Sequence, residues 1–267
     1  MHTTDLLLRL PALGLPILNA KAAVWELLGR ASIPSPERCG DLPRALHRKI
    51  RRLWTLLIGA RVGHENELFG MMRFAERLAL VRYAAKVRGG QSAVELGAHA
   101  GVSSCFLAAG LRHSGAKGLW AVDTFEGTTT VEIDKQSYTH TTEAAGGSVL
   151  PQFRRNLAMA GLSSLVSAKP GRTTDVADTW PGDPIGLLLV DADHSYEACR
   201  ADYETWERHL ADDAIVLFHD HEPAYPGVIQ VVDELLAAGR LRHVETICTL
   251  KICRYCGARA CARAAAM

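Results

Sequence analysis

From residue 92 onward, short apolar segments alternate with helical patterns, and this alternation constrains the fold more than any other feature of the chain. The apolar segments fall at about residues 92–96, 118–122, 165–169, 185–190, 214–218, 243–247 and 249–253. Residues 185–190 are almost all aliphatic, as expected for a strand buried on both faces. Strands separated by helices predict a doubly wound α/β fold, with a seven-stranded, mostly parallel sheet and right-handed crossovers.

Helices are expected in the connections, at about residues 102–112, 148–160 and 228–238. Another helix follows residue 195, and its predicted buried face consists of Tyr196, Cys199, Tyr203, Trp206 and Leu210. Upstream of the first strand, helical spacing predicts a helix over about residues 65–87. Its expected buried face is formed by Leu68, Met71, Met72, Ala75, Leu78 and Ala79. The stretch between the second strand and residue 148 is expected to be irregular.

The chain divides into three parts by pattern. Residues 1–64 mix basic and apolar side chains around a loop marked by Pro34, Pro36, Gly40 and Pro43, and they predict an N-terminal helical extension. We expect this extension to be a cap or an oligomerisation surface of a homo-oligomer, with a substrate lid as the alternative. Residues 65–256 form the predicted α/β domain, and residues 257–267 are expected to be a flexible tail.

Composition narrows the classes of partner. The formal net charge is +1 and aromatic residues make up 6% of the chain, so we expect neither nucleic acid nor a membrane as a partner. The apolar stretch over residues 6–28 is too interrupted for a transmembrane span, by Arg9, Pro11, Pro16, Lys21 and Glu26. No signal peptide is recognisable, and seven cysteines, an odd number, argue against a disulfide framework. A cytoplasmic location is therefore expected.

In a parallel sheet of this kind, ligands bind beyond the carboxyl ends of the strands. After the first strand, Gly97 and Gly101 allow a sharp turn and a close approach of the backbone to a ligand, and Glu95 offers a carboxylate to a cationic amino group. The second strand ends at Asp123, whose carboxylate suits both hydroxyls of a ribose. The glycine pair alone is weak evidence, because an ordinary tight turn has the same pattern.

Three further strand ends carry polar or ionisable side chains. In chain order these are Arg172 and Thr173 after the third strand, Asp191, Asp193 and His194 after the fourth, and His219, Asp220 and His221 after the fifth. Scattered surface charge would not place such groups at one strand end after another. The rim of the predicted sheet is therefore the candidate site.

These segments resemble the motifs of class I S-adenosylmethionine-dependent methyltransferases. Residues 94–101 (VELGAHAG) resemble the first motif of that class. Residues 122–127 (VDTFEG), 156–161 (NLAMAG), 191–197 (DADHSYE) and 217–220 (LFHD) resemble a bacterial branch of small-molecule O-methyltransferases, which includes macrolide-sugar and aminocoumarin-sugar enzymes. The resemblance covers about residues 65–253. It implies S-adenosylmethionine as cofactor and methyl transfer to a hydroxyl of a small molecule, such as a sugar or phenol of a secondary metabolite.

The resemblance also implies which residues bind the cofactor. These are Glu95, Gly97, Ala98, Gly101, Ser103, Asp123, Thr124, Arg172, Thr173 and Asp191. The first motif would shape the pocket for the methionine part, Asp123 would hold the ribose, and Arg172 and Thr173 would lie near the adenine.

A divalent metal, magnesium or manganese, is also implied, with Asp191, His219 and Asp220 as its ligands. Several relatives have a second carboxylate where this chain has His219, and an imidazole gives the site a softer character than an all-oxygen magnesium site. A site without metal is the alternative.

Methyl transfer from a sulfonium is an in-line displacement, so catalysis depends on alignment and on removal of the acceptor's proton. Asp193 and His194 are the first candidates for the general base, and His221 is a further one. Neighbouring carboxylates are expected to raise the basicity of His194. With a metal that acidifies the hydroxyl, Asp193 suffices as base, whereas without one His194 is the better match to neutral pH.

Two other interpretations of the chain stay open. A structural zinc at Cys248, Cys253, Cys256 and Cys261 is an alternative to their being small buried or tail residues. A nicotinamide-dependent oxidoreductase on a similar sheet, or a catalytically silent binding domain, are the alternative functions. The oxidoreductase would require Gly-x-Gly-x-x-Gly after the first strand, and residues 97–101 (GAHAG) lack that spacing.

Overall fold

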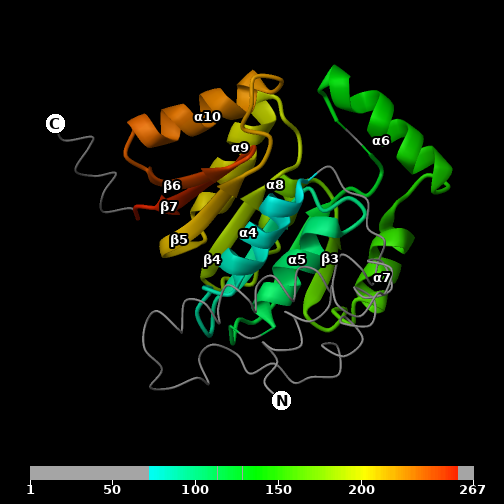
Figure 1. Cartoon of the computed structure of the whole chain (residues 1–267), viewed down its shortest axis with the longest axis horizontal. Coiled ribbons are helices and arrows are strands. Elements are labelled where there is room, and N and C mark those ends of the chain that lie inside the picture. The colour runs from blue at the N-terminus through cyan, green and yellow to red at the C-terminus, as the bar shows by residue number, and fades with distance from the viewer. Residues whose placement is uncertain (1–71, 113, 128, 258–267) are drawn as a thin grey trace, which may run out of the picture. The chain divides into compact units, whose positions relative to one another are not determined.

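The computed structural model describes residues 72–257, except residues 113 and 128. These residues form a seven-stranded sheet in the order β3-β2-β1-β4-β5-β7-β6, drawn in Figure 1. The strands are β1 (Ser92–Leu96), β2 (Leu119–Asp123), β3 (Val166–Pro170), β4 (Ile185–Val190), β5 (Leu210–Phe218), β6 (Leu241–Ile247) and β7 (Leu250–Tyr255). Strands β1 to β5 are parallel, and β7 is antiparallel to both of its neighbours. The predicted doubly wound, mostly parallel sheet is therefore confirmed.

The expected helical extension at residues 1–64 and the tail beyond residue 257 lie outside the described residues.

The register of the parallel strands places the predicted site residues on one rim. Leu96 pairs with Val122 on one side and with Val190 on the other, and Val190 pairs with Phe218. The carboxyl ends of β1, β2, β4 and β5 are therefore level with one another. The chain turns to opposite sides of the sheet after β1 and β4, which makes this rim a topological switch point where ligands bind.

Helices cover both faces of the sheet. On one face, α4 (Phe74–Ala84) packs on α5 (Val102–Leu111), which also contacts α7 (Leu150–Met159). On the other face, α8 (Thr173–Ala177), α9 (Tyr196–Glu207) and α10 (Pro226–Ala237) bury a large apolar cluster against the strands. Alternation along β1 divides its side chains between these faces: Val94 and Leu96 join the cluster under α9, whereas Glu95 bonds to Ser104 on α5.

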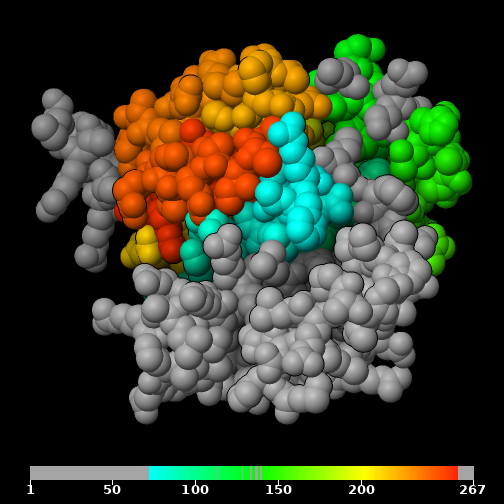
Figure 2. Space-filling view, in the orientation of Figure 1, coloured from blue at the N-terminus to red at the C-terminus, as the bar shows by residue number. Residues whose placement is uncertain are grey.

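Helix α4 differs from its sequence-based prediction. Within the described residues it begins at Phe74, and Leu68 and Met71 lie outside them. Its buried face includes Ala79 as expected, but Ala75 is exposed and Leu78 is only partly buried. The helix packs on α5 and also on β6, where Arg82 and Tyr83 bond to Glu245. Figure 2 shows α4 in cyan beside the orange-red β6–β7 surface. A helix that packs on two neighbouring elements buries side chains on two sides. Its sequence therefore shows no single apolar stripe.

The expectation of an irregular stretch after β2 is wrong, because a helix, α6 (Glu132–Ala144), occupies part of it. The short helix α8 was also not expected. In Figure 1, α6 stands away from the sheet. Among the side chains of α6 whose burial is described, the two buried ones, Asp134 and Thr142, are polar, so they contribute no apolar period from which to predict the helix. Among the described residues, no helix is long and apolar enough to cross a membrane.

The described cysteines are all free thiols. Cys253 is buried in the core on β7, whereas Cys248 is exposed and Cys256 is partly buried. Cys261, the fourth residue of the alternative zinc site, lies outside the described residues. Burial in the sheet explains Cys253 as a small apolar side chain.

Candidate active site

A cavity of about 690 Å³ lies beyond the carboxyl ends of the strands. Most of the predicted site residues line it, namely Gly97, Ala98, Ser103, Asp123, Thr124, Arg172, Thr173, Asp191, Asp193, His219 and Asp220. Four predicted residues are not part of this lining: Glu95, Gly101, His194 and His221. One cavity therefore joins the predicted cofactor residues to the predicted metal ligands.

Asp123 is held in place by backbone groups. Its two carboxylate oxygens accept the N–H of His99 at 2.7 Å and the N–H of Phe125 at 2.6 Å. Both donors have positive φ, 43° and 59°, in the left-handed region that side chains other than glycine rarely adopt. Each oxygen keeps a second lone pair for a hydroxyl donor, as the predicted contact with a pair of ribose hydroxyls would require.

Glu95 lies beneath the cavity and not at its surface. Its side chain is fully buried, and one oxygen accepts a hydrogen bond from the hydroxyl of Ser104 while Oε1 has no partner among the described residues. Burial raises the pKa of Glu95 to about 8, with the negative charges of Asp191 and Asp123 adding to the effect. At neutral pH the side chain is therefore mostly protonated.

Each glycine of the first motif allows a close contact, but the two contacts are with different parts of the chain. Gly97 has φ of 90°, and a Cβ there would come within 1.9 Å of the carbonyl oxygen of Asp191. Gly101 has φ of 87° and is the residue before α5, where a Cβ would press on the ring of Phe153. The close approach at Gly97 is thus between the ends of β1 and β4, and it brings Asp191 to the cavity.

The turn after β3 bonds to Asp202, a residue of α9 that the sequence analysis missed. The hydroxyl of Thr173 donates to the carboxylate of Asp202, and the indole N–H of Trp206 donates to the carbonyl of Thr173 at 3.0 Å. Asp202 comes from the buried face of α9 and also lines the cavity. Burial raises the pKa of Asp202 to about 7. The sequence offered one signal for this site residue, because Asp202 is acidic and directly precedes Tyr203 on the buried face of α9.

Asp191, His219 and Asp220 come together as predicted. Their ligand atoms all lie within 4.8 Å of one another. Nδ1 of His219 is 3.1 Å from Oδ1 of Asp191 and 3.2 Å from Oδ2 of Asp220. Asp220 has φ of 52°, a left-handed conformation that turns the chain sharply after β5. The three side chains can hold a divalent ion between them.

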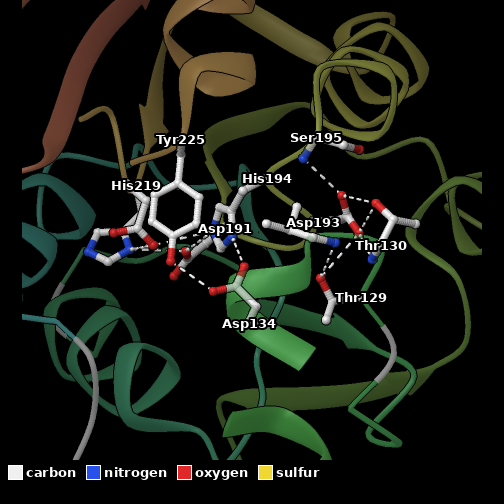
Figure 3. A network of polar contacts seen from close by, with 11 residues as sticks. Thr129, Thr130, Asp134, Asp191, Asp193, His194, Ser195, His219 and Tyr225 are labelled. Carbon is white, nitrogen blue, oxygen red and sulfur yellow. Dashed lines mark hydrogen bonds and ion pairs between the residues drawn. The ribbon is translucent and has the colours of Figure 1, made fainter. Parts of the chain in front are cut away.

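His194 is buried. Figure 3 shows its ring beside Asp191. Its Nδ1 is 2.9 Å from Oδ2 of Asp134 on α6, and the hydroxyl of Tyr225 donates to Oδ1 of the same carboxylate at 2.8 Å. Its Nε2 lies 3.3 Å from Oδ2 of Asp220 and 3.7 Å from Oδ1 of Asp191. Burial lowers the pKa of His194, but hydrogen bonding and charge from the carboxylates outweigh it and raise the pKa to about 9.

Glu76 of α4 supports His219 from the opposite side. Its side chain is fully buried, and it accepts the N–H of Arg73 at 2.6 Å and the N–H and hydroxyl of Thr249, each at 2.8 Å. Oε2 of Glu76 is 3.5 Å from Nε2 of His219. Burial works against the charge of Glu76, but the hydrogen bond from His219 and those from the backbone lower its pKa to about 2.

Asp193 lines the cavity, but its carboxylate is also hydrogen-bonded to neighbouring residues. Its carboxylate accepts the backbone N–H and the hydroxyl of Thr130, the N–H of Ser195 at 2.9 Å, and a long bond from Thr129 at 3.4 Å. Figure 3 shows these bonds directed away from the Asp191 cluster. Burial raises and the hydrogen bonds lower the pKa of Asp193, and the net shift is downward. The carboxylate joins the loop before α6 to the start of α9.

The remaining candidates occupy different positions. His221 donates its backbone N–H to Thr249, and its buried Nε2 has no partner among the described residues, but it is outside the cavity lining. His99 and Tyr138, which the sequence analysis did not select, line the cavity with their rings edge to face at 5.4 Å. Tyr138 and Asp134 lie on α6, so missing that helix also hid both residues.

Comparison with known proteins agrees with this geometry. Residues 94–221 match a family model described as a methyltransferase domain. The match begins in β1 and ends just beyond β5, so it spans the whole rim from Gly97 to Asp220. This part of the chain is therefore similar to a methyltransferase domain, which agrees with the resemblance of its motifs.

Solved structures share the fold at low sequence identity. The O-methyltransferase NovP superposes with a TM-score of 0.60 at 17% identity, over 79% of this chain and 99% of that one. TomG from Streptomyces achromogenes, an O-methyltransferase involved in tomaymycin synthesis and solved with SAM, has a TM-score of 0.50 at 18% identity, over 76% of this chain and 90% of that one. Cofactor-bound Rv0187 from MTB also has a TM-score of 0.50, at 16% identity over 75% and 89%.

Proposed function

We propose that this chain transfers the methyl group of S-adenosylmethionine to a hydroxyl of a small molecule, with a sugar or a phenol as the expected acceptor. The observation that carries the proposal is the single cavity lined by both Asp123 and the group of Asp191, His219 and Asp220. A donor bound at Asp123 and an acceptor bound at Asp191 would share one space. The solved structures of two O-methyltransferases with this fold, one of them with SAM, support the same reaction.

The residues on the β2 and β3 side would bind the cofactor. Asp123 is held so that its free lone pairs can accept the two ribose hydroxyls. Arg172, Thr173 and Asp202 lie around the part of the cavity expected to hold the adenine. These contacts orient the methyl group without taking part in the displacement, and orientation accounts for most of the rate in a reaction of this type.

The residues after β4 and β5 would act on the acceptor. A divalent ion held by Asp191, His219 and Asp220 would acidify a bound hydroxyl. Asp193 lines the same cavity and would accept the proton as the C–O bond forms and the C–S bond breaks, leaving S-adenosylhomocysteine. We prefer Asp193 to His194 as the base, because His194 is buried and does not line the cavity.

The test combines binding with product analysis. Calorimetry with S-adenosylhomocysteine and with a nicotinamide dinucleotide should give binding of the first alone. Incubation with S-adenosylmethionine and a panel of phenols, catechols, sugar nucleotides and amines should give a mono-methylated product from a hydroxyl acceptor. Preferred binding of the dinucleotide, or methylation confined to amines, would refute the proposal.

A further inference from the structure

Glu76 of α4 places a buried carboxylate directly behind the imidazole of His219. Glu76 is 0% exposed and His219 is 3% exposed. The carboxylate accepts the backbone N–H of Arg73 and both the N–H and the hydroxyl of Thr249, and its Oε2 lies 3.5 Å from Nε2 of His219. A buried charge is costly unless other groups hydrogen-bond to it or pair with it. The ring of His219 is thus one of the groups that offset the charge of Glu76.

The surroundings of Nε2 show that this nitrogen of His219 carries a hydrogen. The carboxylate of Glu76 can only accept hydrogen bonds. It stays charged, because the hydrogen bonds from His219, Arg73 and Thr249 outweigh burial and lower its pKa to about 2. Oγ1 of Thr249 lies 3.5 Å from Nε2 and gives its own hydrogen to Oε1 of Glu76. Nε2 therefore faces two acceptors and must be their donor.

The opposite nitrogen of the ring faces the two aspartates. Nδ1 of His219 is 3.1 Å from Oδ1 of Asp191 and 3.2 Å from Oδ2 of Asp220, and the ligand atoms of these three residues lie within 4.8 Å of one another. Burial lowers the pKa of His219, but the surrounding carboxylates outweigh it and hold the pKa well above its ordinary value. Without an ion, Nδ1 therefore carries a proton as well. A divalent ion bound here would replace that proton, whereas the hydrogen on Nε2 would stay between the ring and Glu76.

We propose that Glu76 is the positioning residue of the metal-binding group. Its carboxylate holds the Nε2–H of His219, so that the ring presents Nδ1 to an ion on its other side. A half-turn of the imidazole about the Cβ–Cγ bond would put a carbon atom, Cδ2, where Nδ1 now lies, and the contact with Glu76 opposes that turn. A carboxylate behind a ligating histidine also increases the donor strength of the ring.

This role depends on an imidazole at position 219. A carboxylate there would have no hydrogen to donate to Glu76, and it would add a second negative charge beside a buried one. Glu76 should therefore favour metal binding when residue 219 is histidine, and should not favour it when residue 219 is aspartate. The inference rests on the proposed function only for the use of the ion, because metal binding can be measured without cofactor or acceptor.

The experiment is a double-mutant cycle on the full chain after removal of bound metal by chelation. Calorimetry with cobalt chloride compares the parent protein, Glu76→Gln, His219→Asp and the double variant. Glu76→Gln should weaken cobalt binding about 10–100-fold in the parent protein and should not weaken it in His219→Asp. Equal weakening in both backgrounds would show that Glu76 only supports the fold, and would refute the proposal. Absence of cobalt binding by the parent protein would overturn it at the first step.

Thr249→Val is the matched control. It removes the hydroxyl bonded to Oε1 of Glu76 and leaves Oε2 facing the ring of His219. This variant should weaken cobalt binding far less than Glu76→Gln does. A loss as large as that of Glu76→Gln would show that packing around the carboxylate sets the metal affinity, and that its contact with the ring does not.

A measurement without a substitution at Glu76 applies even where Glu76→Gln does not fold. In nitrogen-15 spectra of the zinc form, the ring of His219 should carry its hydrogen on Nε2 and none on Nδ1, and its signals are identified by their loss in His219→Asp. A hydrogen on Nδ1 in the zinc form would overturn the proposal. Metal binding as described, with no methyl transfer to any hydroxyl, would refute the proposed function alone.

Discussion

The two halves of the cavity hold their polar groups in different ways. On the β2 side, Asp123 is fixed by two backbone N–H groups from its own loop and the loop after β1. On the β4 and β5 side, Asp191, His194, His219 and Asp220 contact one another, and their outer partners come from α4 and α6. On the β2 side, neutral backbone donors satisfy the carboxylate of Asp123. On the β4 and β5 side, carboxylates and imidazoles lie close together, and a proton or a metal ion must lie among them to balance their charge.

This difference has a consequence for function. A carboxylate fixed by backbone groups presents the same acceptor geometry whatever the solution contains, so the β2 side, where we propose that the cofactor binds (the cofactor half), is preorganised. On the β4 and β5 side, where we propose that the metal binds (the metal half), a cluster of ionisable side chains changes its charge with metal and pH. Changes to the metal half should therefore alter turnover and spare cofactor binding, and changes to the cofactor half should do the reverse.

The largest effect is expected from removal of metal. Chelation followed by dialysis should lower turnover at least about a hundredfold, because the acceptor hydroxyl is then no longer acidified. The affinity for S-adenosylhomocysteine, measured by calorimetry, should change by less than about twofold, because Asp123 is held by backbone donors. Added manganese or cobalt should restore the rate. Full turnover after exhaustive chelation would show that the metal half works without an ion.

Substitution of the proposed base should give the next largest effect. Asp193→Asn should lower kcat by about 10²–10⁴-fold with little change in cofactor affinity, since a positioned base contributes that much. Thr130→Val is the matched control, because it removes a hydroxyl bonded to Asp193 and leaves the carboxylate in place. A loss in Thr130→Val as large as that in Asp193→Asn would mean that Asp193 acts only by anchoring the loop.

The same comparison explains what the sequence predicts and what it does not. Gly97 and Asp191 directly follow strands, Asp123 ends β2, and Asp220 comes two residues after β5. The order of strands and the rule for parallel sheets therefore place these four residues on one rim. The sheet was predictable for the same reason, because apolar strands such as Ile185–Val190 are recognisable locally.

The supporting residues were not predictable. Glu76 lies on a helix before β1, and its contact with Thr249 joins positions far apart in the chain. Asp134 lies on α6, and its side chain is polar where the helix meets His194, so apolar spacing did not mark this position. Their roles depend on tertiary contacts between distant elements, and hydrophobic patterning carries no information about such contacts.

A smaller effect, confined to binding, is expected in the cofactor half. Asp123→Ala should weaken S-adenosylmethionine binding at least about tenfold, because two charge-assisted hydrogen bonds of about 1.5–3 kcal/mol each are lost. Asp220→Asn serves as the crossed control and should leave that affinity nearly unchanged while turnover falls. Both affinities can be measured by calorimetry. Equal losses of affinity in the two variants would show that the halves of the cavity are not separate.

The smallest effect concerns Glu95, which lies beneath both halves. Its pKa is about 8 in the folded protein, against 4.5 as the ordinary value. The folded state therefore favours the protonated form, and the stability that this preference provides is fully present below pH 4.5 and is lost as pH rises toward 8. The slope is at most about 1.4 kcal/mol per pH unit, so Glu95 should cost roughly 1 kcal/mol of unfolding free energy between pH 6 and pH 7. The Glu95→Gln variant cannot ionise at this position and should lack that decline, so the difference between the two proteins in urea unfolding isolates Glu95 from the titrating histidines. Parallel pH profiles for the two proteins would contradict the raised pKa. Cofactor affinity at pH 7 provides a second measurement, because a mostly neutral Glu95 outside the cavity lining predicts little change in Glu95→Gln, whereas a direct contact with the amino group of the cofactor predicts a clear loss.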